Sequence, residues 1–196
     1  MSQANDIERH PWPPFIPENA KMLILGTFPP KPEKWSMDFF YPNKINDMWR
    51  IIGLIFFNKI NYFWDDSKKC FIVNKIKDFL QCKKIALWDT AMEVRRLKDN
   101  ASDKFLDIVT PIDLEKILSE NPSIKAIVTT GEKASEVVSN QANICIPKIG
   151  EQSTCCIGTH NFDFYRMPST SRAYPLKLEK KADYYRSLFL HLGIID

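Results

Sequence analysis

Short apolar runs alternate with helical patterns along most of this chain. The apolar runs predict buried β-strands at Met22–Leu25, Lys84–Trp88, Ile124–Thr129 and Asp163–Met167. Apolar residues at helical spacing predict helices at Asp47–Phe57, Lys69–Leu80, Ile112–Ser119, Glu132–Ser139 and Leu176–Leu190. Strands alternating with helices predict an α/β fold, and strands that are apolar throughout need both faces covered. We therefore expect a three-layer αβα sandwich with a short central, mostly parallel sheet.

The segment before the first predicted strand has a different character. Residues 10–19 (HPWPPFIPEN) hold four prolines, which lack the amide hydrogen that a helix or a central strand would use. We expect an extended lead-in over residues 1–20, with ordered elements beginning at Met22. Because 196 residues fit around one hydrophobic core, a single domain is expected over residues 1–196.

Composition then narrows the class of protein. With 44% hydrophobic and 26% charged residues, the chain lies in the ordinary globular range, which excludes disordered and collagen-like proteins. No apolar run approaches the roughly 18 residues of a membrane span, and the first ten residues lack the apolar segment of a signal peptide. The five cysteines fit neither a disulfide framework nor a CxxC zinc pair. We expect a cytoplasmic monomer without membrane contact, associated with the nucleoid if bacterial.

The loops after Gly26, Trp88 and Thr130 are the expected place of a site, because parallel sheets bind ligands outside the carboxyl ends of their strands. The GTFPP loop has neither a GxGxxG nor a GxxxxGK[ST] pattern, and its prolines remove amides that would bind phosphate. The three histidines are too dispersed for a local metal motif. Ser153 lacks the second glycine of a nucleophile elbow. We therefore expect no cofactor and no metal.

Three segments, spread over most of the chain, carry a family resemblance through their order and spacing. They are Leu23–Pro30 (LILGTFPP), Phe40–Trp49 (FYPNKINDMW) and Met167–Arg172 (MPSTSR). They resemble the uracil-DNA glycosylase superfamily, and within it the mismatch-specific and hypoxanthine-DNA glycosylase branches. In that family the first segment is a strand with a Gly-x-x-Pro loop at the base pocket, and the third is a Pro-Ser loop that pinches the DNA backbone. Residues 87–89 (LWD) match a further short motif of the hypoxanthine branch.

The resemblance implies a monofunctional DNA glycosylase of base-excision repair. Such an enzyme flips a deaminated base, here uracil or hypoxanthine, out of the DNA and hydrolyses its N-glycosidic bond. DNA is then the partner. The implied base pocket includes Gly26, Thr27, Phe28 and Thr130.

Tyr41 falls where the family places the aromatic ring that stacks on the extruded base. A ring face in the pocket restores about 1–3 kcal/mol of the stacking energy lost on flipping, and it tolerates different bases. The alternative is that Tyr41, like its neighbours Phe39 and Phe40, is simply a core residue.

Asn46 is the first candidate for catalysis. In the mismatch branch the usual asparagine lies in the Gly-x-Asn-Pro loop, and here that position is Phe28, which cannot hold a water. In the hypoxanthine branch an asparagine corresponding to Asn46 is thought to orient the water through its side-chain carbonyl. The alternative role is an N-cap, because Asn46 precedes an apolar helix. Asp47 is the second candidate, as the carboxylate that activates water, although an acidic residue in a first helical turn is also favoured by the helix dipole.

Two departures from the family bear on the substrate. Thr130 replaces a base-reading asparagine, so the paired donor and acceptor that select uracil are absent. Met167 replaces the histidine that would stabilise the oxyanion of the departing base in the most active uracil branch. We therefore expect slow turnover or a base that leaves more easily.

Contact with DNA is indicated by local charge. Six basic and two acidic residues lie between Arg166 and Arg186, a local charge of +4 against +3 for the whole chain. Ser169 and Ser171 are expected to bind phosphate oxygens while Arg172 enters a groove or fills the vacated stack. The alternative is an amphipathic surface helix whose charges are merely solvated.

Two other functions remain open. Phe28, Thr130 and Met167 would also fit a non-catalytic module that binds DNA or recognises damage on the same fold. A bifunctional lyase would need a lysine as nucleophile, and Lys44 is near enough to the motifs to be checked by borohydride trapping.

Overall fold

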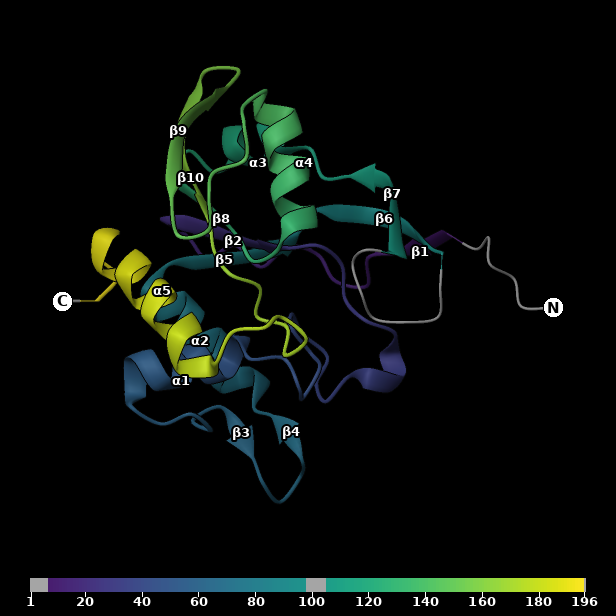
Figure 1. Cartoon of the computed structure of the whole chain (residues 1–196), viewed down its shortest axis with the longest axis vertical. Helices are drawn as coiled ribbons and strands as arrows, with labels where there is room; N and C mark the ends of the chain where they lie inside the picture. Colours follow the sequence, from purple (N-terminus) through teal and green to yellow (C-terminus); the bar gives the residue numbers. More distant parts are fainter. Residues whose placement is uncertain (1–6, 98–104, 196) are drawn as a thin grey trace.

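A five-stranded sheet forms the centre of the computed structural model, which describes residues 7–97 and 105–195 (Figure 1). Its strand order is β5-β2-β8-β10-β9, and neighbours pair in parallel except β9, which runs antiparallel to β10. The bounds are β2 (Met22–Gly26), β5 (Ile85–Asp89), β8 (Ala126–Thr129), β9 (Gln152–Ile157) and β10 (His160–Arg166). The predicted α/β class is therefore confirmed.

Helices lie on both faces of this sheet. They are α1 (Met48–Phe57), α2 (Val73–Lys83), α3 (Leu114–Glu120), α4 (Glu132–Ala142) and α5 (Leu178–His191). In Figure 1, α3 and α4 lie on one side of the strands, and α1, α2 and α5 lie on the other. No helix in the described part of the chain is long and apolar enough to cross a bilayer.

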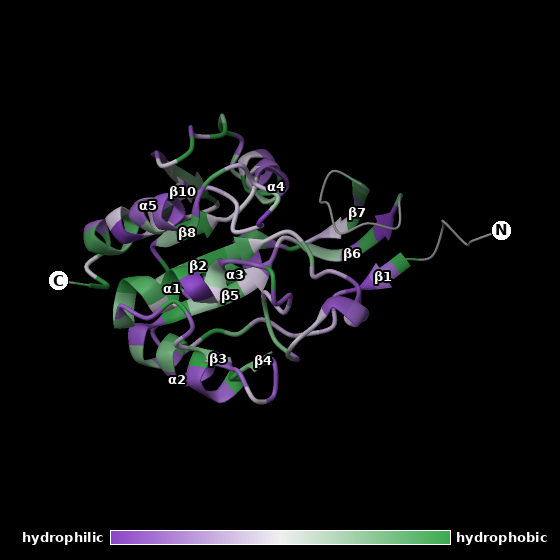
Figure 2. Cartoon of the chain, turned by 60° about the horizontal axis from the view of Figure 1, so that its bottom comes forward, coloured by the Kyte–Doolittle hydropathy of each residue, from purple (hydrophilic) through white to green (hydrophobic). Residues whose placement is uncertain are grey.

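The alternation of side chains along each strand explains the two packed faces. In β2, Met22 and Ile24 belong to the apolar cluster that includes α1, α2 and α5 residues, whereas Leu23 and Leu25 belong to the cluster that includes α3 and α4 residues. Figure 2 shows the hydrophobic central strands, with α2, α4 and α5 carrying both hydrophilic and hydrophobic residues. The wholly apolar strand runs are thus the consequence of burial on both faces.

The second predicted helix begins later than expected. Residues 70–71, which the sequence assigned to it, form β4 (Cys70–Phe71), which pairs with β3 (Trp64–Asp65). The rings of Trp64 and Phe71 meet edge to face at 5.0 Å between centroids. Lys69 makes the turn with a φ of 52°. This hairpin takes the residues that helical spacing alone would have placed in α2.

A second, antiparallel sheet was not predicted. It contains β1 (Ile7–Arg9), β6 (Ala91–Arg96) and β7 (Leu106–Pro111) in the order β1-β6-β7. The expectation that ordered elements begin at Met22 is therefore wrong. The lead-in is extended, but β1 pairs with β6, and Phe15 exchanges backbone hydrogen bonds of 3.0 and 2.9 Å with Leu87. Residues distant in the sequence supply the hydrogen-bond partners of the lead-in's backbone. The composition of the lead-in could not reveal these partners.

Candidate active site

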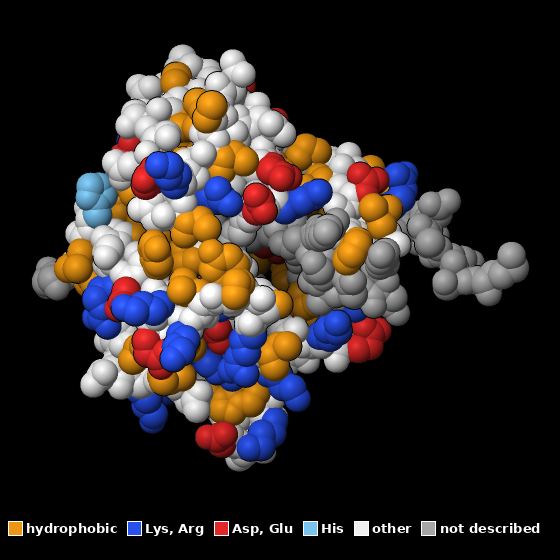
Figure 3. Space-filling model, in the orientation of Figure 1, with side chains coloured by type: hydrophobic (Ala, Val, Ile, Leu, Met, Phe, Trp, Pro, Cys, Tyr) orange, Lys and Arg blue, Asp and Glu red, His pale blue; other side chains and the backbone are white. Residues whose placement is uncertain are grey.

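A cavity of about 1030 Å³ opens where the carboxyl ends of the central strands meet. The loops that follow β2, β8 and β10 supply much of its wall, together with Asp89 at the end of β5 and residues from the segment 41–46. Figure 3 shows the hollow near the middle of this face, bordered by both basic and acidic side chains. This is the edge of the sheet at which the sequence predicted a site.

The cavity unites residues that are far apart in the chain. Every predicted site residue except Asp47 lies in its wall: Gly26, Thr27, Phe28, Tyr41, Asn46, Thr130, Ser169, Ser171 and Arg172. Asp89 and Met167 also line it. The three motifs of the family resemblance therefore converge on one space, although the role of each residue stays a prediction.

Tyr41 is half-buried in the cavity wall, and its hydroxyl lies 3.0 Å from Oγ1 of Thr130. Its backbone φ of 53° is unusual for a residue other than glycine, and such strain tends to occur at functional sites. The ring of Trp49 meets that of Tyr41 edge to face, at 6.3 Å between centroids. Tyr41 is thus held by contacts at its ring and at its hydroxyl while it contributes to the cavity wall.

Asn46 lies at the cavity wall directly before α1. Its Oδ1 accepts a hydrogen bond of 2.9 Å from the amide of Met48, the first residue of that helix. The N-cap position itself is Asp47, one residue later than expected, but the Asn46 side chain still satisfies a free amide of the first helical turn. An amide oxygen has two lone pairs, so one remains for a water in the cavity. Capping and catalysis are compatible in this geometry, because the cap fixes the direction of the carbonyl group.

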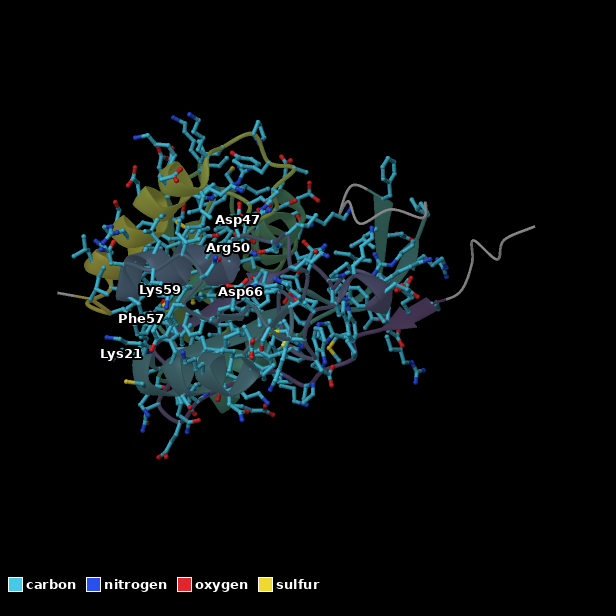
Figure 4. The ribbon with its side chains drawn as sticks, turned by 90° about the horizontal axis from the view of Figure 1, so that it is seen from below. Lys21, Asp47, Arg50, Phe57, Lys59 and Asp66 are labelled. Atoms are coloured by element: carbon cyan, nitrogen blue, oxygen red, sulfur yellow. The ribbon has the colours of Figure 1, made fainter. Side chains whose placement is uncertain are left out.

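Asp47 does not line the cavity, but its carboxylate binds residues of the loop that does. This buried carboxylate, 4% exposed, accepts hydrogen bonds from Nε of Arg172 at 3.1 Å and from Nζ of Lys181 at 2.9 Å. Lys181 also donates to the carbonyl oxygen of Ser171 at 2.7 Å. Figure 4 shows Asp47 and Arg50 close together at one end of α1, with Phe57 at the other end. Asp47 therefore ties the Pro-Ser loop to α1 and α5.

The buried position of Lys181 corrects the charge argument made from the sequence. Lys181 is one of the six basic residues between Arg166 and Arg186 that were expected to favour DNA, but its side chain is 0% exposed and paired with Asp47. A signal was present in the sequence. Lys181 lies at helical spacing from Tyr185 and Leu188, which are buried on the same face of α5.

The Pro-Ser loop is held by backbone and side-chain bonds along its length. The amide of Met167 donates to the carbonyl of Thr129 at 2.9 Å, and the buried hydroxyl of Tyr185 donates to the carbonyl of Pro168 at 3.0 Å. Burial raises the pKa of the Tyr185 hydroxyl well above its ordinary value, so it remains a donor. The loop is thus preformed.

The serine hydroxyls of this loop are positioned by local turns. Oγ of Ser169 accepts from the amide of Ser171, and Oγ of Ser171 accepts from the amide of Ala173, both at 3.2 Å. A hydroxyl that accepts can still donate its own hydrogen. Both groups therefore have a donor available for a phosphate oxygen.

Positive charge gathers where the loop meets α1. Burial and, after it, the positive charge of Arg172 lower the pKa of the Arg50 guanidinium below its ordinary value, while Asp47 acts in the opposite direction. The side chain of Arg172 is 49% exposed although its Nε is bonded to Asp47. An anchored and partly exposed guanidinium of this kind suits a phosphate.

Sequence reasoning missed one residue behind the cavity wall. His10, treated as part of the lead-in, places its Nε2 2.9 Å from Oδ2 of Asp89. Its ring also meets that of Phe28 edge to face, at 5.5 Å between centroids. No local motif could reveal this pair, which is separated by 79 positions. Within residues 7–97 and 105–195, no group of three or more His, Cys, Asp or Glu side chains is arranged to hold a metal ion.

Comparisons with known proteins agree with the resemblance carried by the three segments. The chain is 29% identical over 131 residues to a hypoxanthine DNA glycosylase from Methanosarcina barkeri, covering 66% of this chain and 75% of that protein. Its fold is similar to the solution NMR structure of a candidate uracil DNA glycosylase from Methanosarcina acetivorans, with a TM-score of 0.64, 22% identity, and coverage of 96% of this chain and 99% of the other. No family model matches the chain.

Proposed function

We propose that this relative of the hypoxanthine-DNA glycosylases, within the uracil-DNA glycosylase superfamily, is a monofunctional DNA glycosylase that removes a deaminated base, uracil or hypoxanthine, in base-excision repair. The observation that carries the proposal is the single cavity in which Tyr41, Asn46 and the Pro-Ser loop meet. An enzyme acting on a base must take that base out of the stack, and such a cavity can receive it.

The chemistry assigned to the cavity is hydrolysis. The base stacks on Tyr41, and Oδ1 of Asn46 orients a water toward the anomeric carbon. As the N-glycosidic bond breaks, its electron pair leaves with the base, and the water oxygen forms the new bond to the sugar. The proton that this water loses passes through solvent to the departing base, which is released neutral. The transition state resembles an oxocarbenium ion, so a neutral amide that positions the water is sufficient.

The alternative is a non-catalytic module that binds damaged DNA. Phe28 and Met167 favour it, because neither side chain can hold a water or stabilise a leaving base, and both line the cavity. The two functions differ in one measurable product, the free base.

Release of free base from defined oligonucleotides decides between them. We expect release from duplexes that carry uracil or hypoxanthine, and the same assay with xanthine and thymine mismatches defines the range. Strand cleavage and borohydride trapping are expected to be absent, as for a monofunctional enzyme. Binding to all these duplexes without release of any base would instead establish the binding module.

Substitution of Tyr41 tests base stacking. Tyr41→Leu keeps apolar bulk but loses the ring face, so single-turnover release should fall by roughly 5- to 150-fold, which corresponds to about 1–3 kcal/mol. Tyr41→Phe keeps the ring and loses the bond to Thr130, which costs about 0.5–1.5 kcal/mol of stability and leaves stacking intact. Thermal melts and single-turnover rates should be measured on both variants. Equal rates per folded molecule for the Tyr, Phe and Leu proteins would show that Tyr41 does not stack on the base.

The salt dependence of DNA binding tests the Pro-Ser loop. Each phosphate contact contributes roughly −0.9 to the slope of log K against log salt on duplex DNA, so Arg172→Ala should flatten the slope by about one unit. Arg9→Ala is the matched control, because Arg9 is exposed on β1 and does not line the cavity. An unchanged slope in the Arg172 variant would remove this residue from the interface.

A further inference from the structure

A buried carboxylate lies at the inner end of the cavity, and no step of the proposed hydrolysis uses it. Asp89 ends β5, is buried and contributes to the cavity wall. Burying an ionised carboxylate costs free energy unless other groups pair with it. The partners of Asp89 therefore indicate its role.

The histidine behind Asp89 determines which carboxylate oxygen is engaged. Nε2 of His10 lies 2.9 Å from Oδ2 of Asp89, and the two side chains are 2% and 9% exposed. Nδ1 of the same ring lies 2.8 Å from the carbonyl oxygen of Trp12 and 3.2 Å from the Trp12 amide. Nδ1 can accept from that amide, and the tautomer that does so carries its proton on Nε2. In this tautomer Nε2 donates to Oδ2 of Asp89.

Packing fixes the histidine as well. Its ring stacks on Phe40 at 5.8 Å and meets Phe28 edge to face at 5.5 Å between centroids. His10 is thus a positioning residue, held on several sides, that sets the orientation of the Asp89 carboxylate.

The other carboxylate oxygen of Asp89, Oδ1, lies next to Gly26 at the end of β2, near the hydroxyl of Tyr41. A Cβ at Gly26 would overlap Oδ1 of Asp89 and would lie 3.3 Å from the Tyr41 hydroxyl. The Tyr41 hydroxyl is itself 3.0 Å from Oγ1 of Thr130. Glycine at position 26 therefore lets a carboxylate oxygen and a pair of hydroxyls approach the same end of the cavity.

These groups match the edge that deamination creates. Adenine N1 and cytosine N3 carry lone pairs, whereas hypoxanthine N1 and uracil N3 carry a hydrogen next to a carbonyl group. A carboxylate oxygen accepts from the N–H and repels the lone pair. Beside this carboxylate, the mutually bonded hydroxyls of Tyr41 and Thr130 make the same end of the cavity polar.

We infer that Asp89, positioned by His10, reads the N–H edge of the extruded base and so selects bases with an N–H beside a carbonyl over adenine and cytosine. This inference rests on the proposed glycosylase function and names its substrate class. Asp89 would also compensate for the absence of a base-reading asparagine at Thr130. The hydrogen-bond acceptor for the base then comes from the end of β5 instead of from the loop after β8.

The test compares bases that differ at this edge. Single-turnover release is measured from oligonucleotides with hypoxanthine or unsubstituted purine, and with uracil or 2-pyrimidinone. The second base of each pair has a lone pair in place of the N–H and lacks the carbonyl. The ratio of the two rates is compared between proteins, so differences in the intrinsic reactivity of the bases cancel.

Three variants and one control make the test specific. Asp89→Leu should lower the ratio by about 10- to 100-fold, the scale of losing one hydrogen bond to a charged group. Asp89→Asn should also lower it by about 10- to 100-fold, because Nε2 of His10 donates to the amide oxygen and leaves the amide nitrogen, a donor, facing the base. His10→Phe keeps the ring packing and should lower the ratio by about 10-fold. Asp107→Leu, on the exposed surface of β7, should leave the ratio unchanged.

The outcomes separate the inference from the function on which it rests. If the unaltered protein releases no base from any of the deaminated duplexes, the proposed function fails. If it releases hypoxanthine or uracil, and Asp89→Leu and Asp89→Asn keep the same ratio with unchanged melting temperatures, the function stands and the inference is overturned. A loss of stability alone would lower both rates together and leave the ratio unchanged, which also counts against base reading by Asp89.

Discussion

Asn46→Ala is expected to lower the rate of base release by about 10²–10³-fold, the scale of removing one group that acts in the transition state. The side chain lies at the cavity wall, and its carbonyl is directed by the amide of Met48. DNA affinity should change little, because phosphate contacts dominate affinity. Single-turnover release and DNA binding should therefore be measured on the same variant.

The capping bond is the confounding factor in this experiment. Loss of an N-terminal cap costs about 0.5–2 kcal/mol of stability. Asn46→Ser retains a capping oxygen, and Asn46→Asp retains both the cap and an acceptor for water. We expect release to stay low in the serine variant and to be partly retained in the aspartate variant, with melting temperatures near that of the unaltered protein for both. Undiminished release in the alanine variant would refute the catalytic assignment of Asn46.

Asp47→Ala should destabilise the fold by about 3–5 kcal/mol, because it leaves the ammonium of Lys181 buried without a counter-charge. The corresponding fall in melting temperature is roughly 6 to 20 °C for a chain of this size. Thermal denaturation followed by circular dichroism measures it. The Pro-Ser loop should loosen as well, since the Asp47 carboxylate binds it through Arg172. The bond from the Asp47 backbone amide to the Thr170 carbonyl is kept in this variant.

A double substitution separates the anchoring role of Asp47 from a catalytic one. Asp47→Ala combined with Lys181→Met removes both buried charges, so the double variant should be more stable than Asp47→Ala alone. If Asp47 anchors the rim, base release per folded molecule should recover with stability. If Asp47 activates the water, release should remain abolished in the stabilised double variant, and the ranking of Asn46 above Asp47 would be wrong.

The pattern of apolar residues was sufficient to predict those elements whose buried residues lie close together in the sequence. The run Met22–Leu25 predicted β2 to within one residue, and Glu132 was predicted as the first residue of α4. Both follow from the spacing of apolar residues and from chain-stopping glycines. The pattern was misleading at Lys69, because pairing of β3 with β4 outweighs helical spacing.

The cavity wall was predictable because its residues belong to motifs with a known order in a family. Their convergence follows from the parallel sheet, which brings the ends of β2, β8 and β10 to one edge. The β1-β6-β7 sheet gave no comparable signal, since its short strands alternate irregularly and pair across long separations.

Sequence alone determined the α/β class, the edge of the sheet at which the cavity lies, and the residue types available there. Tertiary structure alone decided which charges are paired. Asp47 meets Lys181 across 134 positions, and His10 meets Asp89 across 79. The same side chains would be solvated surface groups in another packing, and only the packed core removes the water that would otherwise take their hydrogen bonds.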